Sequence, residues 1–119
     1  MMKKPILGSV FLSLALITGH SFAHTTLLSS TPANNSMIKQ APEKVTLNFG
    51  AEVMLMNIKL LDAKGKDIPL NYQVNHDHKK SFDIAVPQLK AGQYTIVWMI
   101  MGADGHHMKG DYRFTIQAK

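Results

Sequence analysis

Apolar and polar residues alternate one by one along three segments of the chain, 45–49, 82–86 and 112–116. A half-buried β-strand imposes this period, because successive side chains point to opposite faces of its sheet. A fourth segment, 94–101, is apolar on both faces over most of its length, which is typical of a strand in the middle of a sandwich. Helical spacing of apolar residues is hard to find, so the pattern predicts an all-β protein.

Three further segments, 24–29, 57–61 and 68–74, have the composition of strands, the last of them more weakly. Stretches rich in turn residues separate the strands, as at 31–36 and 62–67. The total of about seven strands is typical of an Ig-like fold. We therefore predict an all-β, Ig-like Greek-key β-sandwich or barrel of about seven strands.

The first part of the chain has the pattern of a secretory signal. Two lysines precede an apolar run over 6–17 that is too short to span a bilayer, and small residues at Ser21 and Ala23 form a signal-peptidase site. We expect residues 1–23 to be a cleaved signal peptide and residues 24–119 to form one domain. No later segment is apolar enough to cross a membrane, so we expect a periplasmic product that does not span the membrane.

Composition argues against several other classes of protein. The 119 residues include no cysteine, which removes both disulfides and thiolate metal sites. The formal net charge is +5, but two of these charges belong to the predicted signal peptide and the others are scattered. After that peptide, Lys79–Lys80 is the only adjacent basic pair, and no basic stripe interleaves with aromatic residues. We expect no nucleic-acid partner.

The predicted cleavage would make His24 the first residue of the processed chain. A histidine in that position offers two ligands, because its free α-amine and its imidazole Nδ1 can close one chelate ring on a metal ion. The reference pKa of an α-amine, about 7.7 to 8.0, allows the amine to lose its proton near neutral pH when a metal competes for it. An internal histidine lacks this capacity.

A polar turn over 102–108 follows the apolar segment that carries Trp98. Asp104 and His106 lie two residues apart, so in an extended segment both side chains would point to the same side, with Gly105 permitting a tight backbone. Together with His24 they supply three nitrogens and one oxygen. This set suits tetragonal Cu(II), and Zn(II) is the reasonable competitor.

With these residues in view, the chain resembles the CopC family of periplasmic copper-binding proteins. The resemblance covers essentially the whole of 24–119, and its features are a signal peptide followed by His24, the stretches 29–33, 41–49 and 91–94, and Trp98 leading into 103–106. It implies an Ig-like β-sandwich and a role in copper storage or in handover to a CopD-like inner-membrane copper transporter. It also implies one Cu(II) ion held by His24, Asp104 and His106.

The chain departs from the family pattern at three places, one of which is Glu52, one position later than a glutamate that some members have after an early strand. His107 stands where family members usually have proline, and we interpret it as a surface or supporting histidine. The methionine-rich loop that some members use for Cu(I) is absent, but two other methionine pairs, Met54 with Met56 and Met99 with Met101, share faces by the strand period. Thioethers are soft ligands suited to Cu(I), whereas core filling is the commoner role of methionine, so a second Cu(I) site stays open.

Two rival functions also stay open. Some copper oxidases that act on polysaccharides use an N-terminal histidine brace, but a carboxylate as fourth ligand would occupy a position that oxygen chemistry needs. A domain of residues 24–119 also leaves little room for a flat aromatic substrate surface. The other rival is an Ig-like interaction module with incidental histidines. We predict a copper carrier and not an enzyme.

Overall fold

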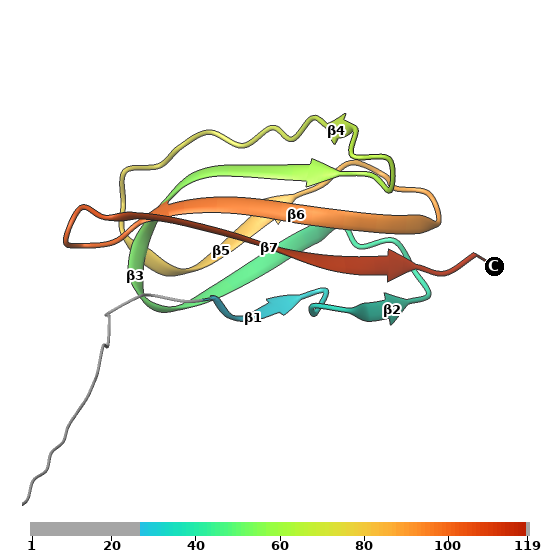
Figure 1. Ribbon diagram of the computed structural model, residues 1–119, viewed down its shortest axis with the longest axis horizontal. Coiled ribbons are helices and arrows are strands. Elements are labelled where there is room, and N and C mark those ends of the chain that lie inside the picture. Colours follow the sequence, from blue (N-terminus) through green and yellow to red (C-terminus); the bar gives the residue numbers. More distant parts are fainter. Residues whose placement is uncertain (1–26, 119) are drawn as a thin grey trace, which may run out of the picture.

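The computed structural model describes residues 27–118, and all regular structure in this range is β-strand (Figure 1). In chain order the strands are β1 (Leu27–Thr31), β2 (Ser36–Ile38), β3 (Lys44–Leu61), β4 (Asp67–Ile68), β5 (Lys79–Ala85), β6 (Gly92–Met101) and β7 (His107–Ile116). The predicted all-β class and the predicted number of strands are therefore confirmed. Within the same range there is no helix that could span a bilayer.

The long strand β3 belongs to both layers of the sandwich. Its first half pairs antiparallel with β1 and β5, and its second half pairs antiparallel with β4 and β6. Between these halves, residues 50–52 are exposed and the register with β5 shifts. Irregularities of this kind let a strand bend and change sheets. The prediction of two separate strands over 45–49 and 57–61 was wrong, because the chain turns this corner without leaving the strand conformation.

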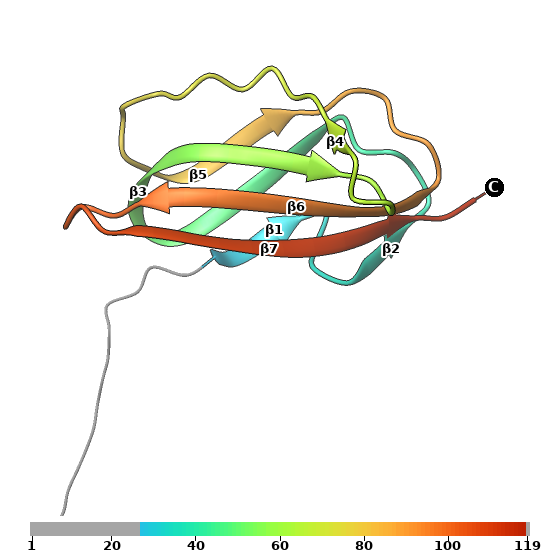
Figure 2. The ribbon, with the colours of Figure 1, turned by 45° about the horizontal axis from the view of Figure 1, so that its top comes forward.

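Strand β6 is central in the second layer, as its apolar sequence predicted, since it lies between β3 and β7. Its two faces differ, however. Tyr94, Ile96, Trp98 and Ile100 are buried in the core, whereas the residues between them are only half-buried. One face of β6 therefore looks into the sandwich and the other lies on its outer side (Figure 2).

Several elements differ from the sequence prediction. The predicted strand at 68–74 is reduced to β4, and the irregular segment after it is fixed by Tyr72, whose hydroxyl donates a 2.7 Å hydrogen bond to the carbonyl of Leu55. Strand β2 was not predicted, and only its first residue falls in the turn-rich stretch 31–36; it pairs parallel with the end of β7. The start of β7 at His107 extends the predicted strand 112–116 toward the turn.

An aromatic cluster fills the core near the corner of β3. The ring of Phe49 makes edge-to-face contacts with Trp98, at 5.3 Å between centroids, and with Phe82, at 6.0 Å. Such pairs add to the stabilisation that burial of the rings provides. The cluster ties both layers together, because Phe49 and Phe82 belong to the layer of β3 and β5 and Trp98 belongs to β6.

Candidate metal centre

The turn that joins β6 to β7 is closed by two backbone hydrogen bonds. The amide of Gly102 donates to the carbonyl of His106, and the amide of Gly105 donates to the carbonyl of Gly102, each over 3.0 Å. Gly105 has a φ of 84°, in the left-handed region where a side chain would be strained. The predicted role of Gly105 as the residue that permits a tight backbone agrees with this conformation.

The side chain of Asp104 is fixed by His106 through two contacts. Asp104 Oδ1 accepts a 3.0 Å hydrogen bond from the His106 amide, and Asp104 Oδ2 lies 2.9 Å from His106 Nδ1. The backbone hydrogen bond, followed by the contact with the imidazole, lowers the pKa of Asp104 below its ordinary value of 3.8. The turn therefore presents an ionised carboxylate beside an imidazole at neutral pH.

These two side chains are arranged suitably for a metal ion. They are largely exposed, with 81% of the His106 side chain and 56% of the Asp104 side chain accessible, so an incoming ion could reach them. Ligands at right angles with bonds of about 2.0 Å lie about 2.8 Å apart. The 2.9 Å between Nδ1 and Oδ2 is close to this separation. A metal could replace the proton between these atoms, or it could bind Nε2 while Asp104 orients the ring.

The turn supplies only two donors. Within residues 27–118 no three histidine, aspartate or glutamate side chains converge on one point. The third predicted ligand residue, His24, lies outside the described residues. In both ribbon views β1 begins on the half of the sandwich that carries the 102–106 turn (Figures 1 and 2).

His107 lies in a different environment from His106. It is opposite Met101 in the β6–β7 pairing, and Met101 is opposite Met54 in the β3–β6 pairing. Directly opposed residues point to the same face of a sheet, with Cβ atoms typically about 4.5–5.5 Å apart. Met54 is only 7% exposed, yet it is not part of the buried core cluster. Met54, Met101 and His107 thus form one cross-strand row, which we call the methionine row.

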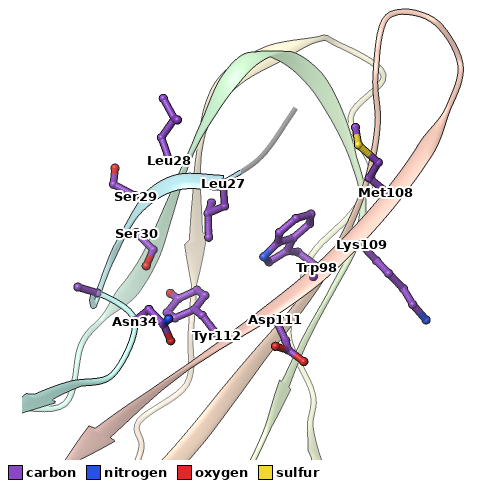
Figure 3. Close-up of a pocket in the computed structure, with 12 residues that line it drawn as sticks. Leu27, Leu28, Ser29, Ser30, Asn34, Trp98, Met108, Lys109, Asp111 and Tyr112 are labelled. Carbon is purple, nitrogen blue, oxygen red and sulfur yellow. The ribbon is translucent and has the colours of Figure 1, made fainter. Parts of the chain in front are cut away.

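A groove that the sequence analysis missed runs between β1 and β7. Its volume is about 850 Å³, and its walls include Leu27, Ser30, Trp98, Met108 and Tyr112 (Figure 3). The groove exists because no backbone pairing joins β1 to β7, so the two layers stay open along this side. The sequence signal that could have indicated it is a glycine inside an alternating strand, at position 110.

Gly110 lies directly opposite Trp98 in the β6–β7 pairing. A Cβ atom at residue 110 would come within 2.5 Å of the indole ring, so only glycine leaves room for the ring in this position. The sequence prediction that Trp98 packs in the core is correct, since the residue is 8% exposed.

The fold and the turn together define a class: a small β-sandwich that presents an aspartate and a histidine at one end. The family model of the CopC domain matches residues 27–117, and the chain belongs to this family. The resemblance predicted from the sequence is thereby confirmed.

Among its relatives, "Protein YobA" of Escherichia coli K12 is 33% identical over 110 residues, which cover 89% of each chain. "Copper resistance protein C" of E. coli is 31% identical over 126 residues, covering 94% of this chain and 98% of that protein. The crystal structure of CopC from Methylosinus trichosporium OB3b is 27% identical, with a TM-score of 0.67 over 79% of this chain and 94% of that one.

Proposed function

We propose that this protein is a periplasmic copper carrier that holds one Cu(II) ion at the β6–β7 turn. The ligands are the amine and imidazole of His24, the imidazole of His106 and the carboxylate of Asp104. The observation that carries the proposal is the Asp104–His106 pair, whose Oδ2 and Nδ1 atoms lie 2.9 Å apart, on the half of the sandwich where β1 begins.

The direction of the strands supports the participation of His24. Strands β1 and β7 run in the same direction (Figure 1). Ser30 of β1 lies beside Tyr112 of β7 across the groove (Figure 3). Neighbouring strands advance by nearly the same distance per residue. If the segment before β1 continued as an extended chain, residue 24 would therefore reach the level of residue 106.

The donor set supports copper as the metal. Three nitrogens and one carboxylate oxygen suit tetragonal Cu(II), which also binds N/O sites most tightly among the divalent first-row ions. The names of two relatives point to the same metal: "Copper resistance protein C" of E. coli, and "Copper transport protein CutJ" of Bacillus subtilis, which is 27% identical over 111 residues that cover 90% of this chain and 20% of that protein. Export of the chain would place this site in the periplasm, where a CopD-like inner-membrane transporter is the proposed recipient.

A carrier fits the site better than an oxidase. In this proposal the Asp104 carboxylate fills a fourth position that oxygen activation would need open. Ascorbate-driven peroxide formation with release of oxidised sugars would favour the oxidase instead. Failure of the processed chain to bind copper tightly would favour the interaction module.

The decisive experiment compares two copper-free chains, one beginning at His24 and one beginning at Ala23. Both are titrated with Cu(II) while the electron paramagnetic resonance spectrum is recorded. We expect a one-to-one complex with nitrogen donors for the first chain. The second should bind at least about a hundredfold more weakly, because its α-amine no longer belongs to the histidine. Equal affinities would contradict the His24 ligand set.

We further propose that the methionine row binds Cu(I). Met54, Met101 and His107 bring two thioethers and one imidazole to a single face, and thioethers are preferred ligands of monovalent copper. Met99 and Met56 lie nearby on the same two strands. Because the sheet separates this row from the core, binding of Cu(I) there would not require the sandwich to open.

A further inference from the structure

Strand β3 has a second neighbour at the place where it carries Met54. At the corner of β3, Val53 pairs with Lys79, the first residue of β5. The two strands are antiparallel, so one step further along this pairing brings His78 beside Met54. Both ribbon views show the chain reaching β5 next to the bend of β3 (Figures 1 and 2).

This second neighbour lies on the opposite edge of β3 from β6. Strand β4 pairs with the end of β3 on one edge, and β6 pairs with the same residues on the other edge. The chain from β4 to β5 stays on the first edge, where the hydroxyl of Tyr72 donates a 2.7 Å hydrogen bond to the carbonyl of Leu55. His78 and Met101 therefore flank Met54 from opposite sides.

The side chain of His78 faces the same way as that of Met54. Directly opposed residues share a face of the sheet, and successive residues of a strand alternate between the faces. Val53 is fully buried in the core, and the Nζ atom of Lys79 opposite it lies 5.3 Å from the ring centroid of the core residue Phe82. Met54 and His78, one step along, therefore face away from this core.

The methionine row thus has an imidazole at each end. His78 lies next to Met54, and His107 lies next to Met101, on strands that are about 4.8 Å apart. Both histidines are exposed, whereas Met54 is nearly buried. Three strand spacings, about 14 Å, separate the two histidines. An ion close to one imidazole is therefore about 10 Å from the strand that carries the other, which favours binding by one imidazole at a time.

We propose that His78 is a second imidazole ligand of the Cu(I) site, and that Met54 and Met101 bind the ion together with either His78 or His107. Thioether and imidazole donors both suit copper, and the thioethers select its monovalent form. This inference rests on the proposed Cu(I) site and deepens it, because it adds a ligand from a segment outside β3, β6 and β7. The ion can pass between the two arrangements by exchanging one imidazole while both thioethers keep it bound.

A neighbouring histidine provides a matched control. The amide of Asp77 donates a 3.0 Å hydrogen bond to Asn75 Oδ1, and such a turn takes the chain off the path of an extended strand. His76 lies within this turn, so it is exposed like His78 but does not continue the pairing with β3. His76→Ala should leave the Cu(I) affinity unchanged.

The first test measures Cu(I) affinity by anaerobic competition with a Cu(I) indicator dye. His78→Ala and His107→Ala should each lower the affinity only about threefold, because one imidazole remains in each variant. A variant with both substitutions should lose at least about a hundredfold, well beyond the product of the single effects. The proposal is overturned if His78→Ala has no effect and the double variant is no weaker than His107→Ala. It is also overturned if the single effects multiply to give the double effect, since the two imidazoles would then not replace each other.

The second test observes the ligands by NMR, which is possible because Cu(I) is diamagnetic. Addition of Cu(I) should shift the ring resonances of His78 and His107 and the methyl resonances of Met54 and Met101, and it should leave the ring of His76 unshifted. Shifts of both methionines and His107 without His78 would mean that the Cu(I) site exists but does not include His78. Equal shifts of His76 and His78 would mean that the loop binds copper adventitiously, which also overturns the inference. If the methionine methyl groups do not shift, the Cu(I) site itself is wrong, and the role of His78 fails with it.

Discussion

His106 and His107 are neighbours in the chain, yet they belong to chemically different regions. His106 ends the β6–β7 turn with its Nδ1 atom 2.9 Å from a carboxylate oxygen of Asp104. His107 begins β7 and lies in a cross-strand row with Met101 and Met54. The boundary between the turn and the strand produces this difference, since His106 contacts Asp104 within the turn whereas His107 is the first residue of β7 and pairs with β6. One histidine thus has hard N/O neighbours and the other has soft thioethers, which suit different oxidation states of copper.

The largest expected effect is a loss of Cu(II) affinity when His106 is replaced, compared with replacement of its neighbour His107. His106→Ala should lower Cu(II) affinity by at least about a thousandfold, because it removes a ligand and the partner of Asp104. His107→Ala should change the same affinity by less than about threefold. Competition titration with a Cu(II) chelator measures both variants. The reverse ranking would mean that the assignment of the turn is wrong.

The next largest expected effect is a difference between the two regions in how metal affinity depends on pH. Cu(II) affinity should fall by at least about a hundredfold from roughly pH 7 to pH 5. Proton competition at the His24 amine, with a reference pKa of about 7.7 to 8.0, accounts for a factor of this size, and the imidazole ligands must also give up protons to bind the metal. Asp104 contributes little to this fall. Its pKa is lowered, so its ionised form and the turn it stabilises persist until the pH drops through that lowered value.

Cu(I) binding at the methionine row should depend less on pH over this interval, since thioethers do not take up protons. Parallel titrations of the reduced and oxidised metal at several pH values measure the two slopes. Equal slopes would contradict the assignment of thioether ligands to the Cu(I) site.

A smaller effect on copper affinity is expected when one methionine of the methionine row is replaced. Met101→Leu preserves an apolar side chain but removes the thioether, and Cu(I) affinity should fall about tenfold with Cu(II) affinity unchanged. Met37→Leu is a matched control, because Met37 is 64% exposed on β2, away from the row. Anaerobic competition with a Cu(I) indicator dye distinguishes the variants. If Met37→Leu has the same effect as Met101→Leu, the row is not the site.

The smallest effect concerns folding stability in the groove region. Gly110→Ala places a methyl group within 2.5 Å of Trp98 and should destabilise the fold by about 1–3 kcal/mol through overpacking. Gly50→Ala is the control, since its methyl group would meet Leu28 at an ordinary 3.7 Å. Chemical denaturation measures the free energy of unfolding of each variant. Equal stability of the two would show that Trp98 can move away from Gly110, contrary to its fixed orientation.

Much of the fold was predictable because it depends on local patterns. Alternation over 82–86 and 112–116 placed parts of β5 and β7, and the apolar segment 94–101 identified the central strand. The continuity of β3 was not predictable, because exposed residues at 50–52 resemble a loop in sequence and only pairing with both layers keeps them in the strand. Strand β2 is likewise too short to form a pattern of its own and exists through its pairing with β7.

The sequence by itself determined the chemistry of this protein: an Asp-Gly-His turn whose contacts span only two residues, a histidine behind a predicted cleavage site, and methionines at strand spacing. The tertiary structure alone decided which distant groups meet. The row of Met54, Met101 and His107 depends on the register of three strands, and the groove beside Trp98 depends on the unpaired edges of β1 and β7. The physical reason is that local hydrogen bonds follow from adjacent residues, whereas register and layer packing are fixed only when the whole core is buried.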